Sequence, residues 1–162
     1  MGELAASATL DEELVSIGLG SCVGVALLDV ACGVAGLAHV MLPAADAAYS
    51  APAKFADRAV PALIACAERA GAQRGRLHAV IVGGAQMFGR AGNAPLDLGA
   101  RNESAVRTAL ELEEIPILAA ATGGSRGRSV RVRPIHLSVC VKEAGGEEVE
   151  LWGAAAAAGG VS

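Results

Sequence analysis

The sequence predicts an α+β fold, a layered α/β sandwich built on a mixed β-sheet. Short apolar runs of strand length alternate irregularly with two longer stretches of helical periodicity. Pairs of apolar runs joined by turns stand near both ends of the chain, as hairpins do. A doubly wound parallel fold would instead require a regular alternation of strands and helices.

Length and composition bound the domain organisation. A chain of 162 residues is the size of one domain. We expect residues 1–152 to form that domain and residues 153–162, which are rich in Ala and Gly, to form a disordered tail. The chain has one Trp, one Tyr and two Phe. The core must therefore be built from Val, Ile, Leu and Ala.

Three strands are expected near the N-terminus, at Leu14–Ile17, Val23–Asp29 and Val34–Leu42. A glycine-rich turn separates the first two, and the turn-like residues 29–33 separate the second from the third. Strands joined by a short turn pair antiparallel, so we expect the second and third strands to lie side by side.

The next part of the chain predicts a loop, a helix and a buried strand. Residues 43–52 are rich in alanine, contain two prolines and lack periodicity, which indicates a loop. A helix is expected over Phe55–Ala70, closed by Gly71. Pro61 predicts a kink in this helix or a later start, because proline removes a backbone donor. Leu77–Val82 has the pattern of a buried strand.

A second helix and three further strands complete the prediction. Asn102 is a favourable N-cap, so the helix is expected to start after it and to run to about Glu114. Strands are expected at Ile117–Ala121, Val130–Arg133 and His136–Lys142, the last two as a closing pair.

Charge and cysteine spacing argue against several classes of protein. A net charge of −4 is not that of a nucleic-acid binder. Four arginines between positions 126 and 133 are typical of a solvent-facing strand, with an anion site as the alternative. The spacing of Cys and His matches no metal motif, so we expect no metal or organic cofactor. No segment resembles a signal peptide or a membrane span. We therefore expect a cytoplasmic protein with reduced thiols and no membrane insertion.

The most informative pattern is a cysteine in a glycine-rich turn, followed by a histidine in the next apolar run. Cys22 ends the turn Gly18-Leu19-Gly20-Ser21-Cys22, and His39 lies in Gly36–Pro43. The expected strand pairing would bring the imidazole beside the thiol, which is the minimum for nucleophilic attack on a carbonyl carbon. We expect this thiol to ionise more readily than an ordinary cysteine. The structural alternative is a small buried Cys and a satisfied core His.

Structural roles account for the other candidate residues. Ser21 is expected to be a turn residue rather than a nucleophile, because no Gly-x-Ser-x-Gly elbow surrounds it. The remaining cysteines and histidines are expected in the core, at the surface or at strand ends: Cys32, Cys66, Cys140, His78 and His136.

Five blocks in a fixed order resemble the CheD family of chemoreceptor glutamine deamidases. Any one block alone is weakly specific for the family. The occurrence of all five in the family's order, over roughly residues 14–142, is specific. The blocks are Ser16–Val25, Gly36–Pro43, Gly83–Phe88, Leu98–Asn102 and Thr122–Ser129. The resemblance implies a CheD-like layered architecture, to which the catalytic domains of cytotoxic necrotizing factor toxins are also similar.

The resemblance implies an enzyme that converts receptor glutamine side chains to glutamate, through a thioester and with release of ammonia. It implies Cys22 as nucleophile, His39 as acid and base, and Ser16 as the hydroxyl that orients the imidazole. Backbone N–H groups of the turn at Gly20 and Ser21, with that of Cys22, are the candidates for stabilising the oxyanion.

The resemblance also implies partners, namely methyl-accepting chemotaxis receptors and a CheC-type phosphatase. Phe88 is expected on the surface that binds them, with a core position as the alternative. The family commonly has Asp where this chain has Ala121, which predicts a looser turn at Thr122-Gly123-Gly124. Two other functions stay open: a non-catalytic adaptor that binds receptors and activates the phosphatase, and a toxin-type cysteine hydrolase or transglutaminase.

Overall fold

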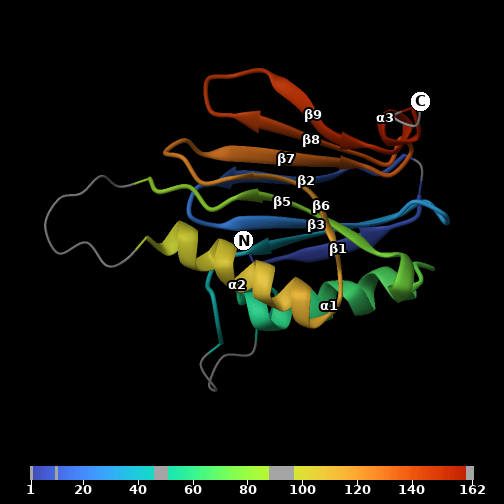
Figure 1. The fold of residues 1–162 in the computed structure, drawn as a ribbon, viewed down its shortest axis with the longest axis horizontal. Coiled ribbons are helices and arrows are strands. Elements are labelled where there is room, and N and C mark those ends of the chain that lie inside the picture. The colour runs from blue at the N-terminus through green and yellow to red at the C-terminus, as the bar shows by residue number, and fades with distance from the viewer. Residues whose placement is uncertain (1, 10, 46–50, 88–96, 160–162) are drawn as a thin grey trace, which may run out of the picture.

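A computed structural model describes residues 2–9, 11–45, 51–87 and 97–159 and shows three stacked layers (Figure 1). The helices α1 (Ala56–Arg69) and α2 (Leu98–Leu112) form one outer layer. A five-stranded mixed sheet lies in the middle, and a four-stranded antiparallel sheet covers its other face. The predicted α+β sandwich with a mixed sheet is confirmed, whereas the separate second sheet was not predicted.

The middle sheet has the strand order β1-β4-β3-β5-β6. Its only parallel pair among the described residues is β5 with β6, which makes the sheet mixed. The predicted pairing of the second and third apolar runs is confirmed, with Gly24 opposite His39. The strands are β1 (Leu4–Ser7), β3 (Val23–Asp29), β4 (Val34–Val40), β5 (His78–Gly83) and β6 (Ile117–Thr122).

The second sheet has the order β2-β7-β8-β9, and all its neighbours are antiparallel. The chain therefore changes sheets between β2 and β3, at the glycine-rich turn. The strands are β2 (Leu14–Leu19), β7 (Arg128–Arg133), β8 (Ser138–Glu143) and β9 (Glu148–Gly153). Neither β1 nor β9 was predicted, because β1 has only four residues and β9 begins with Glu-Val-Glu.

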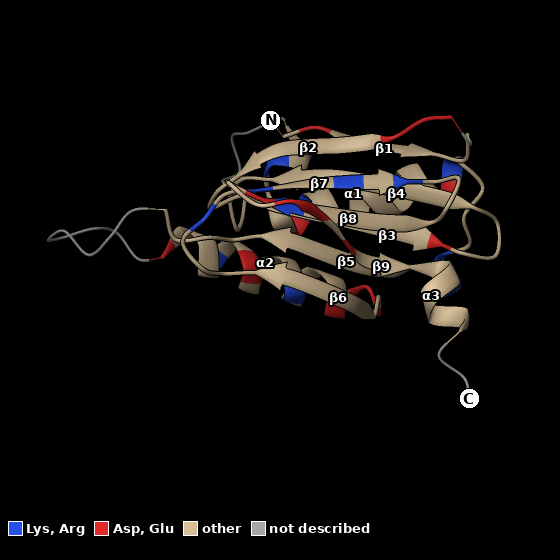
Figure 2. Ribbon diagram, turned by 90° about the horizontal axis from the view of Figure 1, so that it is seen from above, with Lys and Arg blue, Asp and Glu red and all other residues tan. Residues whose placement is uncertain are grey.

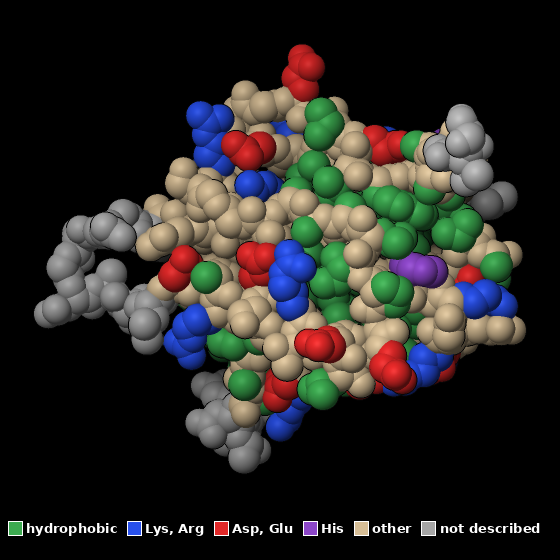
Figure 3. Space-filling model, in the orientation of Figure 1, with side chains coloured by type: hydrophobic (Ala, Val, Ile, Leu, Met, Phe, Trp, Pro, Cys, Tyr) green, Lys and Arg blue, Asp and Glu red, His purple; other side chains and the backbone are tan. Residues whose placement is uncertain are grey.

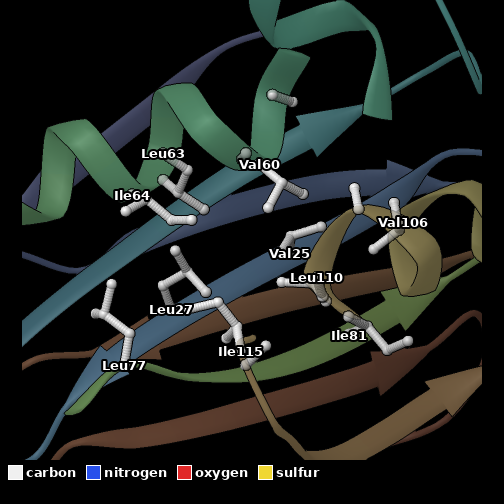
Figure 4. Packing of buried hydrophobic residues seen from close by; sticks show 14 of the residues in the cluster. Val25, Leu27, Val60, Leu63, Ile64, Leu77, Ile81, Val106, Leu110 and Ile115 are labelled. Carbon is white, nitrogen blue, oxygen red and sulfur yellow. The ribbon is translucent and has the colours of Figure 1, made fainter. Parts of the chain in front are cut away.

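The core lies on both faces of the middle sheet. Val25 and Leu27 of β3 pack toward α1 and α2 (Figure 4). Their neighbours Ala26 and Leu28 pack toward the second sheet, in a cluster that also contains Val130. Every residue of β3 and of β4 is buried. A strand covered on both faces is a continuous apolar run, which is why these two were evident from sequence.

The first long helix starts within one residue of its predicted position, whereas the second starts earlier than predicted. Helix α1 begins at Ala56, so Pro61 stands inside it and the later start is wrong. Helix α2 begins at Leu98, and its N-cap is Asp97, whose Oδ1 accepts the N–H of Ala100 at 3.0 Å. The prediction of Asn102 as N-cap is therefore wrong: the residue lies inside α2 and is fully buried.

The short helices complete the description. Two 3₁₀ turns, η1 (Pro52–Lys54) and η2 (Arg74–Arg76), flank α1. Helix α3 (Ala154–Ala158) follows β9 directly, within the segment expected to be disordered. Alanine has the highest helix propensity, and none of these five residues is buried. No helix among the described residues is long and apolar enough to cross a membrane.

Acidic and basic side chains are interspersed over the surface (Figures 2 and 3). On the outer face of the second sheet, Arg131 and Arg133 both pair with Glu13 and Glu148. The prediction of a solvent-facing charged strand holds for these two arginines. It fails for Arg128, whose side chain is only 11% exposed.

Candidate active site

The turn that carries Cys22 connects the two sheets. Gly18 has a φ of +73°, and the N–H of Gly20 donates to the Gly18 carbonyl at 3.0 Å, which closes a tight turn. A β-bulge lies between Ser16 and Leu19, so Leu19 rather than Gly18 is the next buried residue of β2. Ser16 therefore does not share a buried face with Gly18, as it would in a regular strand.

Three consecutive carbonyls of this turn accept hydrogen bonds from the protein. The N–H of Ala85 donates to the Gly20 oxygen at 2.8 Å, and the N–H of Gly84 to the Cys22 oxygen at 2.8 Å. Between them, the Asn102 side-chain nitrogen donates to the Ser21 oxygen at 2.9 Å. These contacts fix the direction of each peptide unit in the turn.

The N–H groups of the turn divide into two kinds. That of Gly20 is used within the turn, as described above. Among the residues that the structure describes, the N–H groups of Ser21 and Cys22 donate to no protein acceptor. A peptide N–H points opposite to the preceding carbonyl, so anchored carbonyls hold these two donors in fixed directions. They can serve an oxyanion, whereas Gly20 provides the turn.

His39 lies on β4 and faces the second sheet. Its Nδ1 is 2.9 Å from the Ser16 hydroxyl on β2, and both residues are buried. Its Nε2 is buried and has no hydrogen-bond partner among the described residues. When the Ser16 oxygen accepts the Nδ1 proton, Nε2 keeps its lone pair and becomes the basic atom.

Strand register places Cys22 close to His39. Gly24 lies opposite His39, and Cys22 precedes Gly24 by two residues. Cys22 also packs against the core cluster between the two sheets, the side that His39 faces. Residues in this diagonal relation have Cα atoms roughly 7–8 Å apart, and their side chains can meet. The structure thus brings Ser16, Cys22 and His39 to the same end of the sheets.

Burial sets the protonation states of the pair. It raises the pKa of the half-buried Cys22 thiol and lowers the pKa of the His39 imidazole. Both effects favour the neutral form of each group at neutral pH. The expectation that Cys22 ionises more readily than an ordinary cysteine is therefore wrong for the resting protein. A neutral imidazole is the form that can accept the thiol proton.

A cavity of about 680 Å³ opens between the edge strands β1 and β2. Ser16 and His39 line it, together with Glu3, Glu13 and Ile17, but Cys22 does not. The cavity therefore adjoins the side of the imidazole that contacts Ser16. Cys22 lies instead at the junction of the β2–β3 turn with the segments after β5 and β6.

Those two segments are joined to each other and to the turn. The N–H of Gly123 donates to the Gly83 oxygen at 3.0 Å, and the N–H of Gln86 to the Gly124 oxygen at 2.8 Å. Arg128 Nη1 donates to the Gly123 oxygen at 2.6 Å. The Thr122 hydroxyl donates to Glu103 at 2.8 Å. The Thr122-Gly123-Gly124 turn is thus held by several contacts although Ala121 precedes it.

Exposed apolar side chains lie around the Cys22 turn. Ile17 is 75% exposed and Met87 is 47% exposed. Met87 lies over Gly20, where a Cβ would be 3.0 Å from the Met87 Cγ. Phe88, the residue expected at the partner surface, lies outside the described residues.

The other thiols and imidazoles lie away from this site. All four cysteines are free; Cys32 is exposed, Cys66 is half-buried and Cys140 is buried. His78 opens β5 and His136 is exposed. The described residues contain no cluster of three or more potential metal ligands.

Sequence reasoning missed the role of Asn102 in the site. Its place in the block Leu98–Asn102 was noted, but the residue was assigned to a helix cap. An asparagine inside a helical stretch, where its propensity is unfavourable, is the signal that points to a tertiary contact.

Comparison with known proteins shows the family of the chain. The model of the family described as "CheD chemotactic sensory transduction" matches residues 41–143. A "Probable chemoreceptor glutamine deamidase CheD" from Clostridium kluyveri is 46% identical over 72% of this chain and 74% of its own length. A protein of the same name from Symbiobacterium thermophilum is 41% identical over 93% of this chain and 94% of its own length. The chain belongs to the CheD family.

Proposed function

We propose that this chain is a chemoreceptor glutamine deamidase that uses Cys22 as nucleophile. The observation that carries the proposal is the buried Ser16–His39 hydrogen bond, which leaves Nε2 without a partner among the described residues, on a strand whose register brings His39 close to Cys22. The names of its relatives support the substrate, since they are described as chemoreceptor glutamine deamidases.

The first half of the reaction forms a thioester. His39 Nε2 takes the thiol proton of Cys22, and Sγ attacks the carboxamide carbon of the substrate glutamine. The carboxamide oxygen becomes an oxyanion, which accepts hydrogen bonds from the N–H groups of Ser21 and Cys22. The C–N bond then breaks, His39 returns its proton to the nitrogen, and ammonia leaves.

The second half restores the enzyme. His39 removes a proton from water, and the hydroxide attacks the thioester carbon. The C–S bond breaks, Cys22 regains its proton and a glutamate side chain is released. Ser16 keeps the imidazole in the orientation and tautomer that both halves require.

A receptor fragment containing the substrate glutamines tests this proposal directly. Incubation with the protein should release ammonia and convert specific Gln residues to Glu, both absent with Cys22→Ala. An adaptor without catalytic activity would bind the fragment and release no ammonia. A toxin-type enzyme would release ammonia from other protein glutamines and leave the receptor fragment unmodified.

We propose a CheC-type phosphatase as the second partner and the cytoplasm as the compartment. The exposed Ile17 and Met87 beside the Cys22 turn support a docking surface at the site itself. A partner bound there would exclude receptors, so adding the phosphatase should inhibit deamidation competitively. If the phosphatase inhibits without raising the apparent KM for the receptor fragment, it binds elsewhere on the protein.

A further inference from the structure

Asn102 is the only side chain that the structure shows bridging the segments of the nucleophile and the base, among the described residues. It lies in the second turn of α2 and is fully buried. Its Nδ2 donates to the Ser21 oxygen at 2.9 Å and to the Met41 oxygen at 2.9 Å. Ser21 precedes Cys22, and Met41 follows His39 by two residues.

The assignment of the amide atoms follows from these partners. Both acceptors are carbonyl oxygens, so the NH₂ group must face them, since the reverse orientation would set three oxygens against one another. Each of the two amide protons then serves one carbonyl. The side chain thereby ties two positions that are far apart in the chain.

The approach of α2 to the turn is itself specific. A Cβ at Gly99 would lie 2.6 Å from the Ala85 oxygen and closer still to the Gly84 oxygen. Glycine at this position lets the helix contact the segment that anchors Gly20 and Cys22. Asn102, three residues later, then reaches the Ser21 carbonyl between those two anchors.

Peptide geometry connects this contact with the chemistry. The Ser21 carbonyl and the Cys22 N–H belong to one planar trans peptide unit and point in opposite directions. A donor that holds the Ser21 oxygen on the α2 side therefore holds the Cys22 N–H on the other side. That N–H has no protein acceptor among the described residues.

We infer that Asn102 is a positioning residue that orients the Cys22 N–H toward the oxyanion of the reaction. The inference rests on the proposed function, because it assumes Cys22 as nucleophile. It assigns to the block Leu98–Asn102 a role in transition-state stabilisation. Asn102 acts through the Ser21 peptide unit and is not assigned a role in proton transfer.

The test compares two reactions of Cys22. Deamidation passes through an oxyanion, whereas alkylation by iodoacetamide does not. Asn102→Ala should lower kcat for a receptor fragment roughly ten- to a hundredfold, less than the loss typical of deleting an oxyanion donor, with KM within about twofold. The rate of Cys22 alkylation, mapped by mass spectrometry, should stay within about twofold of wild type.

Val106→Ala is the matched control. Val106 is fully buried on α2, one turn beyond Asn102, and packs in the core toward β3. It should lower the thermal midpoint without lowering kcat below that temperature. Equal losses of kcat in Val106→Ala and Asn102→Ala would overturn the positioning role.

A second variant guards against misfolding. Asn102→Ser is small and neutral but too short to bridge both carbonyls, so it should show the same fall in kcat. If neither Asn102 variant folds where Val106→Ala does, the amide holds the fold rather than the site, and the inference is rejected. Full activity in Cys22→Ala would instead refute the proposed function, whatever the Asn102 variants do.

Discussion

The Ser16 hydroxyl and the His39 imidazole form a buried hydrogen bond through Nδ1 of the ring. An unpaired buried nitrogen costs free energy, and the Nε2 of His39 is such an atom among the described residues. A residue that keeps this cost is commonly one that uses the free atom in a reaction. In the proposed mechanism, the lone pair on Nε2 accepts the thiol proton of Cys22.

Substitutions should separate the three roles. Cys22→Ala should abolish deamidation, because no other group forms the thioester. His39→Ala should lower kcat by roughly 10²–10⁴-fold, the usual loss for an acid–base residue. Ser16→Ala should be milder because the hydroxyl only orients the ring. Ammonia release with a receptor fragment measures all three. Near-normal turnover in His39→Ala would remove the imidazole from the mechanism.

The pH profile should reflect the buried imidazole. Burial lowers the pKa of His39 from its ordinary value of 6.5, and the reaction needs the neutral ring. The acid limb of kcat/KM should therefore have its midpoint below pH 6.5, with activity retained above it. A midpoint well above 6.5 would mean that the resting pair is a thiolate and an imidazolium.

At the scale of elements, the site depends on β2 and β3, which are consecutive in the chain but belong to different sheets. Ser16 lies on β2 in the second sheet, His39 lies on β4 in the middle sheet, and Cys22 lies in the turn between β2 and β3. The hydrophobic pattern predicted β3 and β4 and their pairing, because both are continuous apolar runs joined by a short turn. It could not show that β2 pairs with β7. A hydrophobic pattern indicates which face of a strand is buried, but not which strand lies beside it.

Gly83 at the end of β5 should be indispensable for the Cys22 turn. It has a φ of +114°, and a Cβ there would overlap the Cys22 carbonyl oxygen. Gly83→Ala should therefore displace the turn and abolish deamidation. Gly33→Ala is the matched control: φ is +70° but nothing lies within 4 Å, so it should cost about 1 kcal/mol and keep activity.

Thermal unfolding and ammonia release on both glycine variants check this expectation. The two substitutions share the strain of a left-handed backbone and differ in the overlap with the turn. Equal activity in both variants would show that the turn tolerates displacement.

At the scale of the whole molecule, one end of the sheets carries the site and the other carries a buried carboxylate paired with a partly exposed arginine. Asp29 at the end of β3 is fully buried and accepts the N–H of Gln73 at 2.9 Å. Arg76 forms a salt bridge with it at 2.9 Å. This cluster ties the β3–β4 turn to the segment after α1, far along the strands from Cys22.

Asp29 should make stability depend on acid pH. Burial alone would raise the pKa of this carboxyl, but hydrogen bonds from Arg76 and Gln73 outweigh it and hold the pKa well below the ordinary 3.8. A lowered folded-state pKa stabilises the fold above about pH 4 and loses that contribution as pH falls below it. Asp29→Asn should lower stability at pH 7 and flatten its dependence on pH between about 5 and 2. Urea unfolding at several pH values measures this, and an unchanged slope would contradict it.

How much of the site could be predicted depends on how local each part is. Cys22 and His39 were recognisable because Cys22 directly precedes β3 and His39 lies on β4, the next strand, which a short turn joins to β3. The contacts of Asn102, Gly83 and Gly99 were not, because they join segments far apart in sequence whose meeting depends on the packing of α2. Asn102 was wrongly predicted as the N-cap because asparagine is a favoured N-cap residue. The helix in fact starts at Leu98, so the Asn102 amide lies inside it.

The crossing of the chain from β2 to β3 also sets the order in which the site can mature during synthesis. Ser16, Cys22 and His39 are translated first, but β2 gains its ladder partner only with Arg128–Arg133, and the Ser21 peptide gains its donor only with Asn102. Until then, Ser16 has no sheet to hold it against the imidazole. The Ser16–His39 hydrogen bond therefore forms late, after Arg128–Arg133 has been made.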